Sequence, residues 1–96
     1  GRRRMNFKKN DIITVITVAG EYVGKYVDES PATLYMADPK MLVSGEQGVG
    51  FGTGICVTGE DNPKFVDFYT GGIVFATKTN DIVTKAYHEA NSGLIL

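Results

Sequence analysis

The stretch from Asp11 to Val43, DIITVITVAGEYVGKYVDESPATLYMADPKMLV, decides the fold of this chain. It holds three successive runs rich in β-branched and aromatic residues, the types favoured in strands. Ala19-Gly20 separates the first run from the second, and Asp28-Glu29-Ser30-Pro31 separates the second from the third. Such runs with tight turn-forming links predict a three-stranded antiparallel meander, which is the start of a small barrel.

Details of these runs refine the prediction. The strand expected over residues 12–18 is apolar on both faces, which favours a place inside a barrel or beneath a partner subunit. Gly24 interrupts the second run, and a glycine inside a strand predicts the bulge or sharp bend that a small barrel needs in order to close. In the third run, Asp38-Pro39 predicts a break because proline has no N–H to donate to the ladder.

The second half of the chain predicts another β unit and then a helix. Residues 44–54, SGEQGVGFGTG, hold five glycines and are expected to form a flexible loop. Strands are expected over three short apolar runs, with Gly71-Gly72 as a two-residue hairpin turn between the last two; the runs are residues 55–58, 65–69 and 73–77. Apolar residues recur at helical spacing over 81–91, after several candidate N-cap residues. We therefore expect a mainly β protein: a small, five-stranded, strongly bent antiparallel sheet or barrel with a short C-terminal helix.

Composition limits the class of protein. The 96 residues are 43% apolar, which fits one domain with a modest core, expected at 11–96 behind an arm at 1–10. The single Cys56 cannot form an internal disulfide. No apolar run approaches the roughly 20 residues of a membrane span, and no apolar signal core follows the first arginines. These features predict a cytoplasmic protein without membrane contact.

Charge is distributed unevenly along the chain. Half of the ten basic residues lie in the first nine positions, namely Arg2, Arg3, Arg4, Lys8 and Lys9. From Asn10 onward, five lysines stand against eleven carboxylates, a net charge of −6. A basic arm of this kind can bind RNA or single-stranded DNA through phosphates. It can equally dock on the acidic body of its own or a neighbouring subunit. A solubilising or self-docking arm is favoured over nucleic-acid binding, because charge runs are usually solvated.

The sequence VAGEYVGKY, from Val18 to Tyr26, resembles the start of the first motif of the Sm-like (LSm) family. Gly20, Gly24 and Asp28 stand where that motif has two glycines and an aspartate. The resemblance covers about residues 12–43, and the glycine-rich segment stands where the family has a variable loop between its third and fourth strands. It implies a small barrel of the SH3-like class and assembly into a homo-oligomeric ring. The chain looks like a divergent, phage-type member, which places it in the host cytoplasm.

Two departures from the family pattern concern its RNA pocket. The signature Asp-x-x-Met-Asn is missing, since Asp28 is followed by ESPAT. The second motif should end in Arg or Lys followed by glycine, whereas Lys78 is followed by Thr79. The resemblance therefore implies the barrel and the ring, and the family's base-binding pocket is not carried over.

No group of residues predicts catalysis, a cofactor or a metal. The run of alternating glycines at 48–54 is not followed by Lys-Ser/Thr, so it is not a phosphate loop. One histidine, His88, and one thiol cannot supply the three or four ligands of a metal site, and Cys56 is expected in the core. The aromatic residues of 64–69 are expected in the core or a subunit interface, with base stacking as the alternative.

These observations predict a non-enzymatic, ring-type homo-oligomeric binding or scaffold module. An Sm-like ring that binds RNA or single-stranded nucleic acid through its basic arm is the alternative. A small-molecule-binding protein or enzyme is the second alternative.

Overall fold

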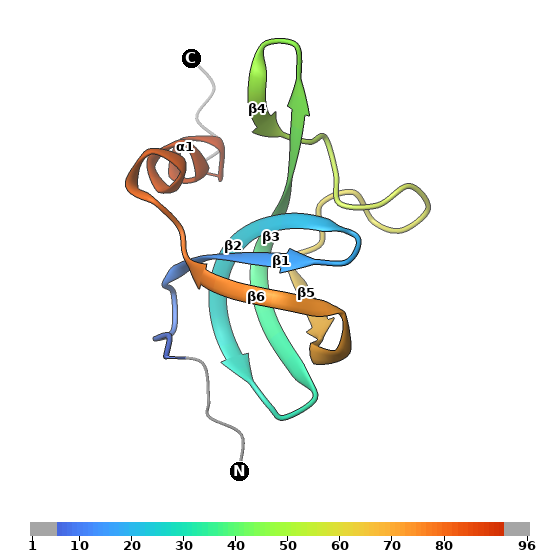
Figure 1. Ribbon diagram of the computed structural model, residues 1–96, viewed down its shortest axis with the longest axis vertical. Coiled ribbons are helices and arrows are strands. Elements are labelled where there is room, and N and C mark those ends of the chain that lie inside the picture. Colours follow the sequence, from blue (N-terminus) through green and yellow to red (C-terminus); the bar gives the residue numbers. More distant parts are fainter. Residues whose placement is uncertain (1–5, 92–96) are drawn as a thin grey trace.

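The computed structural model describes residues 6–91. Arg2–Arg4 lie outside the described residues, and so do the apolar residues 94–96, which the sequence predicts to pack on the body or to meet another subunit. The chain forms a bent antiparallel sheet with one helix at its end (Figure 1). In chain order the elements are β1 (Ile12–Thr17), β2 (Gly20–Glu29), β3 (Thr33–Gly45), β4 (Gly48–Phe51), β5 (Phe65–Tyr69), the 3-10 turn η1 (Thr70–Gly72), β6 (Ile73–Lys78) and α1 (Asp81–Asn91).

The sheet follows the order β4-β3-β2-β1-β6, and β5 pairs with the first part of β3. β3 is long enough to hold β5 along residues 33–37 and β4 along residues 42–45. All pairings are antiparallel, and β2 and β3 curve strongly (Figure 1). The mainly β class and the C-terminal helix are confirmed, with six strands in place of five. No pairing joins β5 to β6 among the described residues, so the sheet is bent without closing.

The turn between β1 and β2 is built by Thr17. Its hydroxyl accepts hydrogen bonds from the Ala19 and Gly20 N–H groups, both at 3.0 Å, and lies 2.9 Å from the Gly20 carbonyl oxygen, to which it donates. A threonine that satisfies the backbone of its own turn in this way stabilises the reversal. The predicted turn at Ala19-Gly20 is confirmed.

The bend predicted at Gly24 is confirmed as a bulge. The register of β2 against β3 shifts at Gly24, which faces the two residues Asp38 and Pro39. A Cβ at Gly24 would lie 2.9 Å from the Ala37 carbonyl oxygen and would overlap the Met36 side chain. Glycine is therefore required here because β3 approaches too closely for any side chain.

The break predicted at Asp38-Pro39 is wrong, because β3 runs on through Gly45. Asp38 has φ +49°, in the left-handed region, and Pro39 is buried. A bulge leaves one residue of the longer strand out of the ladder. Proline's missing N–H is therefore tolerated at this point, and the chain kinks without ending the strand.

The flexible loop predicted over 44–54 is wrong at residues 48–51, which form β4 and a hairpin with the end of β3. Gly48 has φ +108°, a conformation available mainly to glycine, and it pairs with Gly45 at the tip. Glycines at every second position leave the intervening Val49 and Phe51 on one face, a period that suits a strand. The hairpin projects away from the rest of the sheet (Figure 1).

The strand predicted over 55–58 is absent, and Cys56 is exposed there instead of lying in the core. The edge of β3 is already occupied by β4 and β5, so this segment has no strand to pair with. The two-residue hairpin predicted at Gly71-Gly72 is also wrong. Those residues belong to η1, and the chain then crosses to pair β6 with β1.

The core lies between the curved strands. Five buried side chains form its centre, with Phe7, Val66, Phe68, Ile73 and Ala76 packed around them; the five are Ile13, Val15, Tyr26, Leu34 and Met36. In β1, Ile13 and Val15 are fully buried, while the alternate side chains Ile12 and Ile16 are half-buried. β1 is thus apolar on both faces, and the structure covers one of these faces fully and the other only in part.

Helix α1 begins at the predicted position. The Asn80 side-chain oxygen accepts a hydrogen bond from the Val83 N–H at 2.8 Å, which is the geometry of an N-cap. Tyr87 is the one buried residue of α1, whereas Ile82, predicted on the same apolar face, is 83% exposed. The helix is therefore attached to the sheet mainly through a single aromatic side chain.

Candidate interaction surface

Three strands leave one edge open among the described residues. β4 and β5 each pair only with β3, and β6 pairs only with β1. Each open edge presents backbone N–H and C=O groups that another strand can pair with. η1 joins β5 directly to β6, so these two strands are consecutive in the sequence although their open edges belong to opposite sides of the sheet.

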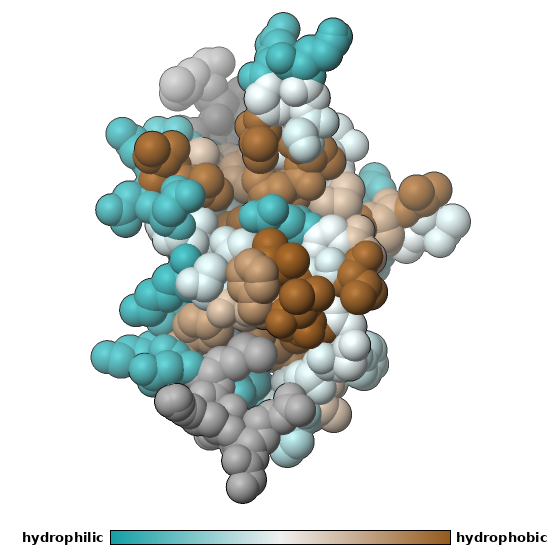
Figure 2. Space-filling view, viewed as in Figure 1, coloured by the Kyte–Doolittle hydropathy of each residue, from teal (hydrophilic) through white to brown (hydrophobic). Residues whose placement is uncertain are grey.

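Large apolar side chains are exposed along these edges. Phe65 and Tyr69 of β5 are 46% and 70% exposed, and Val74 and Phe75 of β6 are 62% and 54% exposed. Figure 2 shows apolar surface gathered where β6 crosses the front of the molecule. Exposed apolar side chains concentrated at open strand edges mark an interaction surface, since a single chain leaves them in water.

An apolar groove adjoins this surface. A part of about 430 Å³ lies beside η1, and a part of about 660 Å³ extends toward β4; both are lined by Ala19, Tyr22, Ile55 and Cys56. The Tyr22 ring lies 5.2 Å from the ring of Phe68. No charged side chain lines the first part. The first part of the groove therefore suits apolar contact, and Asp61 is the charged residue that lines the second part.

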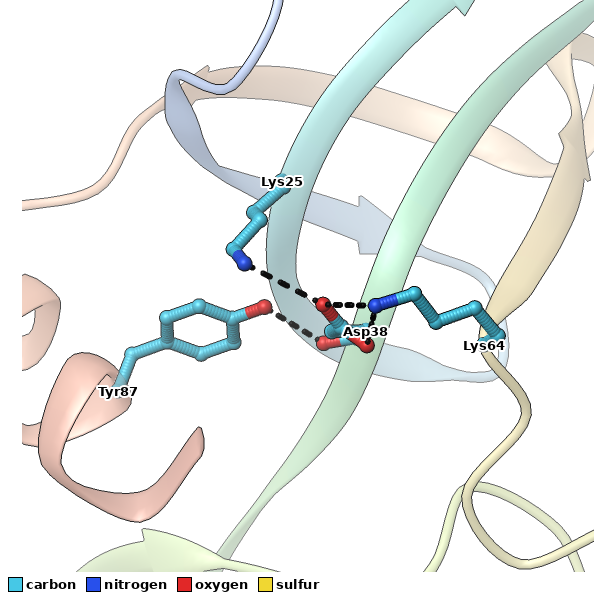
Figure 3. A network of polar contacts seen from close by, with 4 residues as sticks. All are labelled: Lys25, Asp38, Lys64 and Tyr87. Carbon is cyan, nitrogen blue, oxygen red and sulfur yellow. Dashed lines mark hydrogen bonds and ion pairs between the residues drawn. The ribbon is translucent and has the colours of Figure 1, made fainter. Parts of the chain in front are cut away.

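A polar network connects β3 with β2, α1 and the loop before β5 (Figure 3). The Asp38 carboxylate lies 3.4 Å from the Lys25 ammonium nitrogen and 3.2 Å from that of Lys64. The Asp38 backbone N–H donates to the Lys64 carbonyl at 2.7 Å. On the other side, the Tyr87 hydroxyl donates to the Asp38 carbonyl oxygen, also at 2.7 Å. Asp38, which lies in the bulge of β3, is thus held through its backbone and its side chain.

The surroundings shift the pKa of two of these groups. Burial alone would raise the pKa of Asp38, but hydrogen bonds and charge from Lys64 and Lys25 hold it below its ordinary value. Burial, and secondarily the charge of Asp38, raise the pKa of Tyr87. At neutral pH the network therefore holds an ionised carboxylate and a neutral phenol, which is a structural clamp.

The sequence did not single out this network. From the sequence, Asp38 is expected only to break a strand, and Tyr87 only to belong to the helical apolar repeat of residues 81–91. The two residues are 49 positions apart and meet through a backbone carbonyl, so no motif or spacing connects them. Gly24 and Pro39 are the available signals in the sequence, since glycine and proline inside a strand each often mark a bulge.

The predicted nucleic-acid residues are only partly described. Lys8 and Lys9 are exposed, and the Lys8 N–H donates to the Asp11 carboxylate at 2.9 Å in a turn that leads into β1. His88 is exposed on α1, with its ring 5.9 Å from that of Tyr87. In residues 6–91, no three His, Cys, Asp or Glu side chains come together as metal ligands. Over the same residues, no helix has the length and apolar character needed to cross a membrane.

Comparison of the chain with known protein families, curated proteins and solved structures finds no match.

Proposed function

We propose that the chain is a homo-oligomeric binding or scaffold module of the Sm-like type, without catalytic activity, whose copies join by pairing their sheet edges. One observation carries the proposal. The open edges of β5 and β6 both carry exposed apolar side chains, which a single chain leaves uncovered.

The positions of the edges favour a head-to-tail arrangement. The edge of β5 belongs to one side of the bent sheet and the edge of β6 to the other. When β5 of one copy pairs with β6 of the next, every copy uses two different surfaces. Such heterologous contacts form a ring when the rotation closes. A ring also removes the open edges of β5 and β6, and open edges otherwise promote aggregation.

The free energy that the apolar side chains contribute to such a contact follows from their exposed area. Tyr69 and Phe75 expose more than half of their surface. A fully buried aromatic side chain removes about 150–250 Å² from water, so each of these two can bury roughly 100 Å² more in a contact. At about 25 cal/mol per Å², each then contributes about 2.5 kcal/mol. Backbone pairing adds direction and register to this apolar term.

The Sm-like assignment is supported by the first three strands. Gly20 and Gly24 fall at the turn and the bulge of an antiparallel meander, where the family motif needs them. A long segment, with β4 in it, separates β3 from β5, as the family's variable loop does. Because the Asp-x-x-Met-Asn signature is missing, the proposal does not include the family's RNA pocket.

The oligomeric state tests the proposal. Light scattering should give a mass that is a multiple of the 10.4 kDa chain. Phe75→Lys places a charge on the β6 edge and should reduce that mass. Ile82→Lys is the matched control, because Ile82 is 83% exposed on α1, away from both edges. A wild-type monomer at all concentrations, or equal masses for both variants, would contradict edge pairing.

Binding of RNA or single-stranded DNA is a second candidate, favoured by the charge distribution. Five basic residues lie in the first nine positions, of which Lys8 and Lys9 are exposed. Binding through these residues should weaken as salt increases, because contacts with phosphates release counterions. Affinity for an oligonucleotide should fall on deletion of residues 1–9. Absence of binding even at low salt would exclude this candidate.

A further inference from the structure

The hairpin of β3 and β4 carries the third open edge of the sheet. Among residues 6–91, β4 pairs only with β3, and Gly45 pairs with Gly48 at the tip. This hairpin projects away from the rest of the sheet (Figure 1). The contact proposed between β5 and β6 leaves the edge of β4 uncovered, so this edge needs an explanation of its own.

The hydrogen bonding of β4 to β3 shows which backbone groups lie at the open edge. The Gly52 N–H donates to the Met41 carbonyl at 2.7 Å, so Gly52 directs its N–H toward β3. In an antiparallel strand, successive residues direct their backbone groups to opposite sides. Gly50 therefore also turns toward β3, whereas Val49 and Phe51 direct their N–H and C=O groups away from it. The open edge thus presents the donors and acceptors of these two residues.

The edge of β4 lacks the features that commonly protect an open edge. Lysine, proline or a bulge usually prevents pairing with another chain. The sequence of β4, Gly-Val-Gly-Phe, has no charged residue and no proline, and its register against β3 runs without a shift. Val49 is 71% exposed. Nothing in β4 therefore opposes the addition of a further strand, and its four residues limit the contact to a short ladder.

This edge is complementary to a second copy of itself. When two β4 strands pair antiparallel about a two-fold axis at Gly50, Val49 of each copy lies opposite Phe51 of the other. Because these residues direct their backbone groups outward, each pair exchanges both of its hydrogen bonds. A β-branched residue opposite an aromatic one is also a favourable cross-strand pair. In registers centred on Val49 or on Phe51, the other residue of the two lies opposite a position outside β4.

We propose that β4 of one copy pairs antiparallel with β4 of a second copy, about a two-fold axis at Gly50. Such an isologous contact joins two copies through the same surface. It uses an edge that the contact between β5 and β6 leaves open, so it does not depend on the proposed ring. When both contacts form, the hairpins connect copies of two rings.

Disulfide formation between introduced cysteines tests this pairing. Opposite residues in a non-hydrogen-bonded antiparallel pair have Cα atoms about 4.5 Å apart, within the range of about 4.4–6.8 Å that a disulfide spans. Gly50→Cys should therefore give a dimer linked across the axis. The substitution suits the fold, because a Cβ at Gly50 has nothing within 4 Å. Cys56→Ser is the background for every variant, since Cys56 is exposed and would form disulfides of its own.

Gly45→Cys in the same background is the matched control. Gly45 belongs to the same hairpin and also has nothing within 4 Å of a Cβ, but it lies on β3, one strand away from the open edge. Across the axis, Gly45 and its counterpart are three strand spacings apart, about 14 Å, which no disulfide spans. On non-reducing gels of dilute protein, the Gly50→Cys dimer should form about tenfold faster than the Gly45→Cys dimer, because paired thiols react as though linked.

The outcomes separate this contact from chance collision and from another register. Equal rates for Gly50→Cys and Gly45→Cys would mean random collision and would overturn the pairing. Faster linkage of Val49→Cys than of Gly50→Cys would mean an axis at Val49 and would equally overturn it. Adding Val49→Lys places a charge on the edge and should abolish the linkage of Gly50→Cys, whereas linkage that persists would contradict the proposal.

A last variant distinguishes this contact from the proposed ring. Phe75→Lys weakens the contact of β5 with β6 and leaves β4 unchanged. Linkage through Gly50→Cys should therefore proceed at the same rate in this variant. Loss of the linkage would mean that the hairpins meet only within the ring, which would overturn the independent contact, and circular dichroism of each variant confirms that the sheet is retained.

Discussion

Replacing Tyr87 by phenylalanine tests how α1 is attached to the sheet. Tyr87 is fully buried, and its hydroxyl donates to the Asp38 carbonyl oxygen at 2.7 Å. The substitution removes this one oxygen and keeps the ring, which packs edge-on against Phe51 at 6.3 Å. The expected effect is therefore that of a single part-buried hydrogen bond.

The loss of stability expected for Tyr87→Phe follows from the Asp38 carbonyl, which is left without its hydrogen-bond donor. The hydrogen bond from Tyr87 to Asp38 is part-buried, and a carbonyl that loses its donor away from water costs about 1–3 kcal/mol. Tyr87→Ala would also remove the ring and should cost about 3–5 kcal/mol. In a domain of this size, each 1 kcal/mol lowers the melting temperature by about 4–8 °C. Tyr87→Phe should therefore melt measurably earlier than the wild type, and Tyr87→Ala earlier still.

Thermal and urea unfolding at neutral pH, followed by circular dichroism, measure these differences. Tyr69→Phe is the control, because Tyr69 is 70% exposed and loses the same atom. It should stay within about 0.5 kcal/mol of the wild type. If Tyr87→Phe were as stable as this control, the hydrogen bond to Asp38 would not hold the helix, and our account of the network would be refuted.

Three further outcomes follow from the same contacts. Gly24→Ala should lower the free energy of unfolding by about 2–4 kcal/mol in urea, because its Cβ would lie 2.9 Å from the β3 backbone. Gly50→Ala has open space around it and should be neutral. Equal urea midpoints for the two variants would contradict the close packing at Gly24. Burial would raise the pKa of Asp38, but two lysines hold it below its ordinary value. The stability from this charge is present above the ordinary pKa of aspartate and lost as pH falls through the folded value, so the wild type's advantage over Asp38→Asn should shrink in acid; a constant difference would argue against the ion pairs. Burial and the Asp38 charge raise the pKa of Tyr87, so the wild type should lose stability above about pH 10 more steeply than Tyr87→Phe, and parallel alkaline curves would contradict this.

The first two strands and the start of the third could be predicted because their signals are local. Thr17 and Gly20 close a turn between neighbouring residues, and Gly24 marks a bend within its own strand. The helix from Asp81 is equally local, since its cap and its period lie within about a dozen residues. Where turn chemistry and periodicity agree within a short segment, the sequence alone determines the element.

The second half could not be predicted as well because its structure depends on which edges are free. Residues 55–58 have strand composition and form a loop, since β4 and β5 already occupy β3. Residues 48–51 are rich in glycine and form a strand, since β3 extends far enough to pair with them. Such outcomes depend on competition between distant segments, which strand propensity does not record. The open edges of β5 and β6, on which the proposed function rests, likewise depend on which distant segments pair.

Asp38 explains why a bulge and a helix appear in one small fold. A left-handed φ costs an ordinary residue about 1–2 kcal/mol, although aspartate tolerates it better than most. That conformation lets the backbone of one residue pair in two directions, with its N–H on the Lys64 carbonyl and its carbonyl on Tyr87. A regular strand residue would use those groups in the ladder. The close approach at Gly24 creates the bulge, the bulge frees the carbonyl, and the carbonyl binds α1. The bend of the sheet and the position of the helix are therefore consequences of the same local geometry.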